Sequence, residues 1–176
     1  MEKPILSYWE LVEPVFALVD ISSPEKFAAS SAFIPIPILQ LYASHFALSE
    51  IHNGGLLQFF WNGTGVMLPE AIAGFKAIGM TKLASVITTA AGKLGSPYPR
   101  DRDDRWDALL EASGRDVTEL EEIFAKAANL YLAFEEAVEP LSLSLLSTQV
   151  WDLAQTEQGN FGEAATRYAQ SLTSIA

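Results

Sequence analysis

The chain has 176 residues, no cysteine, and 22 acidic against 11 basic side chains, for a net charge of −11. The lack of cysteine excludes disulfides and thiolate metal sites. The scarcity of clustered lysine and arginine argues against direct binding to nucleic acid. The length suits a single domain, residues 1–176, with its own core. No secretion signal is visible at the N-terminus, so we expect a cytoplasmic location.

The first predicted helix runs from Ile5 to Val19, where apolar residues recur at helical spacing. Ser7 and Glu10 have the spacing of a capping box at its start. Pro14 lies inside it and should kink or split it. The segment 22–37 is rich in serine, alanine and proline, which predicts a connection with a short helical turn after Pro24.

A second, buried helix is expected after Pro37, because its apolar residues wrap most of its circumference. It should end at Asn53-Gly54-Gly55, where glycine can take the left-handed conformation that closes a helix. A short third helix, Leu56 to Trp61, follows. Residues 27–49 carry no formal charge, but the prolines and polar residues among them argue against a membrane span.

Further helices are predicted from Pro69 to Gly79, from Leu83 to Leu94, and through Trp106 to a stop at Gly114. These segments are joined by short connections that contain glycine or proline.

Thr118 and Glu121 have capping-box spacing ahead of one long helix that should reach Val138. Residues 141–146 fit a strand or a helix, and we favour a helix because the chain offers no strand partner. Asn160 with Glu163 should cap a last helix, which extends to residue 175. The predicted fold is an all-α bundle of about eight helices.

The segment from Glu50 to Gly65 reads EIHNGGLLQFFWNGTG, and a proline-arginine-aspartate run follows at residues 99–105. Together they resemble a family of all-helical bacterial proteins, the DNA-mimic-protein-like family, over about residues 40–110. Leu56 departs from the family pattern, which usually has an aromatic residue there, and nothing after about Leu141 can be matched. The resemblance implies an all-helical fold and an acidic surface that imitates DNA phosphates and occupies a DNA-binding protein.

The polar residues of this signature have two interpretations. One is a pocket for a ligand or a catalytic water. The other is structural, in which the amides satisfy backbone groups freed at two neighbouring helix ends. The residues concerned, with the two glycines between them, are Glu50, Asn53, Gly54, Gly55, Gln58 and Asn62.

We expect no metal, no cofactor and no enzymatic activity. His45 and His52 are two helical turns apart, but no third ligand lies near them in sequence on the same face. No nucleophile elbow or phosphate-binding loop is present in the sequence.

Charge is concentrated in residues 101–176, which hold fifteen acidic and five basic side chains against seven and six in residues 1–100. This C-terminal half predicts a surface for a basic protein partner. The alternative is an ordinary soluble surface, because Arg102, Arg105, Arg115 and Lys126 interrupt the run. The candidate surface residues are Asp101, Asp103, Asp104, Asp107, Glu111, Asp116, Glu119, Glu121, Glu122, Glu135, Glu136 and Glu139.

These patterns favour a non-enzymatic interaction protein whose partner is basic, such as a DNA-binding regulator. The alternatives are a small-molecule-binding or catalytic domain that uses the polar signature, and an immunity-type inhibitor of a toxin. A homodimer is compatible with the sequence.

Overall fold

Helices form the secondary structure of residues 7–173, the part of the chain that the computed structural model describes. Within these residues there are ten α-helices, four short 3-10 helices and no strand, so the all-α prediction is confirmed. The α-helices are α1 Trp9–Val12, α2 Pro24–Ser31, α3 Ile36–Trp61, α4 Leu68–Ala77, α5 Thr81–Ala91, α6 Arg102–Ser113, α7 Val117–Lys126, α8 Leu130–Ala137, α9 Leu143–Thr156 and α10 Phe161–Thr173. The 3-10 helices are η1 Glu13–Ala17, η2 Gly63–Met67, η3 Gly92–Leu94 and η4 Glu139–Leu141.

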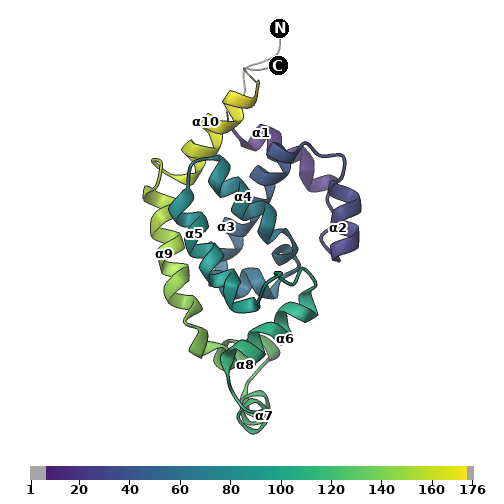
Figure 1. Cartoon of the computed structure of the whole chain (residues 1–176), viewed down its shortest axis with the longest axis vertical. Coiled ribbons are helices and arrows are strands. Elements are labelled where there is room, and N and C mark those ends of the chain that lie inside the picture. Colours follow the sequence, from purple (N-terminus) through teal and green to yellow (C-terminus); the bar gives the residue numbers. More distant parts are fainter. Residues whose placement is uncertain (1–6, 174–176) are drawn as a thin grey trace.

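Helix α3 is the centre of the fold. It packs against α4, α9, α6 and α1, and α5 packs against both α4 and α9. Its apolar residues face several directions, as expected for a helix that is covered on most sides. Figure 1 shows α6, α7 and α8 gathered at the end of the molecule opposite α1 and α10. The three helices that carry most of the candidate surface carboxylates are therefore held at one end of the fold.

The N-terminal region differs from the prediction in how its first helix begins. Helix α1 has Tyr8 at its N-cap position and no side-chain cap, so the predicted capping box of Ser7 and Glu10 is wrong. Pro14 does break the helix, because α1 ends at Val12 and the chain continues as the 3-10 helix η1. The predicted turn after Pro24 is helix α2. The predicted helix start at Ile5 lies outside the described residues.

The single long helix predicted to reach Val138 is wrong. Helix α7 ends at Lys126, and α8 begins at Leu130, after Asn129 has turned to an extended conformation with φ of −157°. The side-chain Oδ1 of Asn129 accepts a hydrogen bond from the Leu132 amide at 3.0 Å. Asparagine is a strong N-cap and a poor interior helix residue, so a local cap overrides the apolar periodicity.

The cap of α7 also differs from the prediction. Asp116 and Glu119 form its capping box, with bonds of 2.9 and 3.1 Å, instead of Thr118 and Glu121. Other predicted ends are confirmed: Gly114 closes α6 with φ of 70°, and Asn160 accepts from the Glu163 amide at 2.9 Å. The segment after Pro140 forms helix α9, not a strand. The predicted end at residue 175 lies outside the described residues.

Among the described helices, none has both the length and the apolar character needed to cross a membrane.

Candidate functional site

Two glycines interrupt the central helix. Gly54 has φ, ψ of −151°, 24°, and Gly55 has 76°, −176°, so the two predicted helices form one element with a sharp kink. Gly55 lies in the left-handed region, and a Cβ atom there would lie 2.9 Å from the Ser147 hydroxyl. That hydroxyl accepts a hydrogen bond from the Leu56 amide at 2.8 Å and donates to the Leu143 carbonyl at 2.7 Å. Helix α9 therefore supplies a partner for an amide that the kink frees.

The polar signature residues meet at one carboxylate, that of Glu50. Its Oε2 accepts hydrogen bonds from Gln58 Nε2 at 2.7 Å and from Asn62 Nδ2 at 2.9 Å, and its Oε1 accepts from the Thr64 hydroxyl at 3.0 Å. The cluster joins the helix before the kink to the helix after it. The two amides thus bond to a side chain, not to backbone groups. Asn53 is exposed and takes no part in the cluster.

Arg105 is a buried cation beneath the acidic end of the molecule. Its side chain is fully buried, and it donates to three carbonyls, those of Phe60 at 2.9 Å, Asn62 at 2.8 Å and Arg100. Burial lowers the pKa of this guanidinium from its ordinary value. Two of the carbonyls lie at the C-terminal end of α3, where the helix dipole favours a cation. Arg105 therefore fixes α6 to the end of α3.

The twelve predicted surface carboxylates lie on α6, α7 and α8, at the N-caps of α6 and α7, and at the start of η4. All are exposed except Asp101, which is half-buried and caps α6 through bonds to the Asp103 and Asp104 amides at 2.8 and 3.4 Å. Asp116 and Glu119 also hold structural roles in the α7 cap. The remaining carboxylates of the set are free of such capping bonds among the described residues. This subset is the better candidate for contact with a partner.

The four basic residues in this region neutralise few of these carboxylates. Arg102 pairs with Asp103 at 3.5 Å, and Lys126 pairs with Glu122 at 3.0 Å. Arg115 donates to the Ala137 and Glu136 carbonyls of α8 at 3.0 and 3.1 Å, and Arg105 is buried. The sequence-based objection that the basic residues break up the acidic surface is thereby weakened, because two of the four bond mainly to backbone carbonyls.

An acidic stripe runs along the outer face of α6. Asp103, Asp107 and Glu111 follow one another at intervals of four residues, and all three are exposed. They lie opposite the face of α6 that carries the buried Arg105 and Leu109. Each step of four residues rises about 6 Å along a helix. The last turn of α6 contains no basic residue that would offset Glu111.

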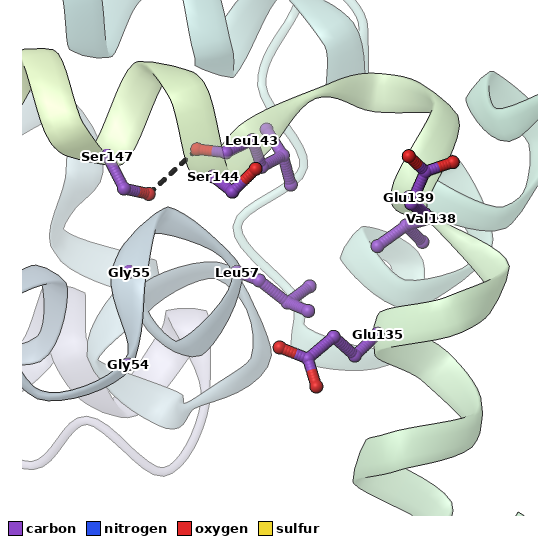
Figure 2. Close-up of a pocket in the computed structure, with 9 residues that line it drawn as sticks. All are labelled: Gly54, Gly55, Leu57, Glu135, Val138, Glu139, Leu143, Ser144 and Ser147. Atoms are coloured by element: carbon purple, nitrogen blue, oxygen red, sulfur yellow. Dashed lines mark hydrogen bonds between the residues drawn. The ribbon is translucent and has the colours of Figure 1, made fainter.

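A pocket of about 380 Å³ lies between the kink of α3 and helices α8 and α9. It is lined by Gly54, Gly55, Leu57, Glu135, Val138, Glu139, Leu143, Ser144 and Ser147. In Figure 2 the side chains of Leu57 and Glu135 extend from opposite sides into the space between them, whereas the Glu139 carboxylate points away toward the rim. The pocket thus brings the signature glycines beside two of the predicted surface carboxylates.

The two histidines line a separate pocket, also of about 380 Å³, together with Tyr8 and Phe161. The Tyr8 hydroxyl and His45 Nδ1 are hydrogen-bonded at 3.0 Å, and His52 packs on Trp151 with ring centroids 4.2 Å apart. Burial lowers the pKa of both histidines, which favours the neutral imidazoles. No group of three metal-binding side chains occurs in the described part of the chain.

Sequence reasoning missed the roles of three residues. Arg105 was counted with the surface charges, although its spacing of four from Leu109 places it on the inner face of α6. Thr64 completes the Glu50 cluster, and Ser147 supports the kink from 91 positions beyond Leu56. No local signal in the sequence indicates the last of these contacts.

Comparison with known proteins identifies a family. Neither the curated proteins nor the solved structures contain a chain that matches this one. A family model described as DMP19-like protein matches residues 32–168, from the end of α2 well into α10. This range extends beyond the residues 40–110 that carry the resemblance in the sequence. Since the match covers most of the chain, the protein belongs to the DMP19-like family of DNA mimic proteins.

Proposed function

We propose that this protein is a non-enzymatic cytoplasmic interaction protein that uses the carboxylates of α6–α8 to occupy the DNA-binding surface of a basic protein. The observation that carries the proposal is the stripe of Asp103, Asp107 and Glu111, three exposed carboxylates in line on a helix that is fixed from below by the buried Arg105. Membership of the DMP19-like family supports the same reading.

The energetics of α6 support a role for the stripe beyond stability. Like charges four apart on a helix destabilise it by about 0.2–0.5 kcal/mol per pair. Glu111 also lies near the negative end of the helix dipole, and the last turn offers no cation. Asp103 is offset by Arg102 and by its place in the first turn, but Glu111 has no such cation in the last turn, and local features that cost stability are expected at functional sites.

A rigid acidic surface is suited to compete with DNA. A DNA-binding protein recognises phosphates largely through lysine and arginine, and most of the affinity is electrostatic. Carboxylates repeated along a fixed helix provide acceptors for the same cations, and complementary fields speed the encounter. The stripe is held in place because Arg105 anchors α6 through three backbone carbonyls.

The test begins with capture of binding proteins from the native host at low and high salt. We expect a basic, DNA-binding protein that is retained at low salt and released as the ionic strength rises. Charge reversal at Asp107 and Glu111 should weaken binding of that partner at least tenfold, or about 1.4 kcal/mol. Neither residue caps a helix or belongs to an ion pair within the described structure, so both changes should leave the fold intact.

The matched control reverses Glu13 and Asp152, two exposed carboxylates on η1 and α9. It changes the net charge by the same amount but should leave the dissociation constant within about twofold of the wild type. If the two double variants weaken binding equally, or if binding is insensitive to salt, the acidic end is not the binding surface. A second experiment tests mimicry itself: duplex DNA should compete with this protein for the captured partner. Absence of competition would mean that the contact is unrelated to DNA binding.

A further inference from the structure

We infer that the pocket between the α3 kink, α8 and α9 receives an arginine side chain of the partner protein. This inference rests on the proposed function, and it assigns the place where a single partner residue is bound most tightly. The pocket lies beside the acidic surface, because Glu135 and Glu139 belong to both. A partner that covers α8 would therefore reach the pocket without a change in the fold.

The shape of the pocket fits a long side chain. Its volume of about 380 Å³ lies within the range of about 300–1,000 Å³ that small-molecule sites span. Leu57, Val138 and Leu143 supply buried apolar walls, suited to the methylene stem of such a side chain. At the kink, Gly54 and Gly55 present backbone without a side chain. The left-handed conformation of Gly55 keeps this wall free of a Cβ atom.

The polar groups of the pocket fit a cation. Glu135 points into the space toward Leu57, Glu139 stands at the rim, and the exposed Ser144 adds a hydroxyl (Figure 2). None of the nine described residues that line the pocket is basic. Within the described chain, neither glutamate forms an ion pair with a lysine or arginine. A cation entering from outside would therefore find negative charge with no internal competitor.

Arginine suits this pocket better than lysine for physical reasons. Its guanidinium is more weakly hydrated than an ammonium and is planar, with five donors arranged in a fork. It can therefore enter a pocket with apolar walls and still bond to carboxylates at two places. Arginines seated in pockets at the centre of a contact are frequent hot spots of binding.

The test uses small probes and does not need the partner. The ¹H–¹⁵N NMR spectrum of the labelled full chain is recorded with increasing N-acetyl-arginine amide, with N-acetyl-citrulline amide as the neutral analogue of the same shape. We expect saturable shifts of the Gly54, Gly55 and Ser147 amides with the arginine probe, and shifts at least fivefold smaller with citrulline. Gly54 and Gly55 lie on the pocket wall, so their amides report occupancy directly.

Two variants block the pocket by different means. Glu135→Gln with Glu139→Gln removes its charge and should raise the dissociation constant of the arginine probe at least fivefold. Ser144→Tyr fills its mouth without a change in charge and should have an effect of the same size. Glu13→Gln with Asp152→Asn is the control for charge, and Thr148→Tyr, four residues along α9 and outside the pocket lining, is the control for the added ring. Both controls should bind the probe as the wild type does.

Three results would overturn the inference. The first is a set of shifts spread evenly over α6–α8, the second is equal weakening by the charge control, and the third is tighter binding of N-acetyl-lysine amide than of the arginine probe. The first two leave the proposed acidic surface standing, because they mean diffuse attraction without a pocket. Conversely, the protein could bind the arginine probe in the pocket and yet capture no basic partner from the host. That result would refute the proposed function and leave the pocket as a cation-binding site.

Discussion

Replacement of Arg105 by methionine tests the central element of the site, the buried guanidinium that joins α6 to the end of α3. Methionine has a similar length and is apolar, so it removes the donor of the Phe60 and Arg100 carbonyls, whereas the Asn62 carbonyl keeps its bond from the Gly65 amide at 3.1 Å. Each buried acceptor left unpaired costs about 1–3 kcal/mol. Loss of the desolvation penalty of the guanidinium, several kcal/mol, offsets part of this sum. We expect a net loss of about 3 kcal/mol in the free energy of unfolding.

The assay is urea denaturation, with unfolding monitored by tryptophan fluorescence. The rings of Trp61 and Trp106 stack 4.1 Å apart beside Arg105 and report on this region. The control is Arg102→Met on the same helix. Arg102 is exposed, pairs with Asp103 at 3.5 Å and lies over Trp106, so its loss should cost no more than about 1 kcal/mol. An anchoring role for Arg105 is refuted if Arg105→Met unfolds within about 1 kcal/mol of the wild type, or if the two variants lose equal stability.

Three further predictions concern local features of the fold. Gly55→Ala should destabilise the protein by more than about 1 kcal/mol, because φ is 76° and the new methyl would lie 2.9 Å from the Ser147 hydroxyl. Gly92 has φ of −60° and open space around it, so Gly92→Ala should be neutral or stabilising in the same urea titration. Asp116→Ala should cost about 1 kcal/mol of unfolding free energy and Thr118→Ala far less, and the reverse order would contradict the observed capping box. Because burial lowers the pKa of His45 below 6.5, the unfolded chain takes up a proton first as the pH falls. The free energy of unfolding therefore falls as the pH drops below about 6.5. Between pH 7 and 5, the His45→Gln variant should lose less of this free energy than the wild type. Equal pH dependence of unfolding in the two proteins would contradict the prediction.

Much of the local structure could be predicted from the sequence. The helical class follows from apolar residues at a spacing of three and four, and the ends of several helices follow from glycine, proline and asparagine. The interruption at Gly54-Gly55 was predicted at the correct residues. The prediction failed at residues 120–138, because apolar periodicity continues through Asn129 although the backbone does not. Periodicity reports which faces are buried, not whether one helix or two supply them.

The candidate site was predicted less completely, because the contacts of its charged side chains depend on the fold. The carboxylates of α6–α8 are visible as a bias in composition, but their pairing depends on where each cation points. Arg105 and Arg115 resemble surface charges in the sequence, and the fold directs both toward backbone carbonyls. Arg105 bonds to a carbonyl 45 positions away in the sequence, and Arg115 bonds to one 22 positions away, so no local pattern specifies these contacts.

The sequence alone determined the helical class, the break in the central helix, the family and the location of the negative charge, because each depends on neighbouring residues or on composition. Only the tertiary structure decided that Glu50 links both sides of the kink, that Ser147 supports it from α9, and that a pocket opens there beside Glu135. These features depend on contacts between segments far apart in the chain. Such contacts are set by how the helices pack, and packing is a property of the whole fold.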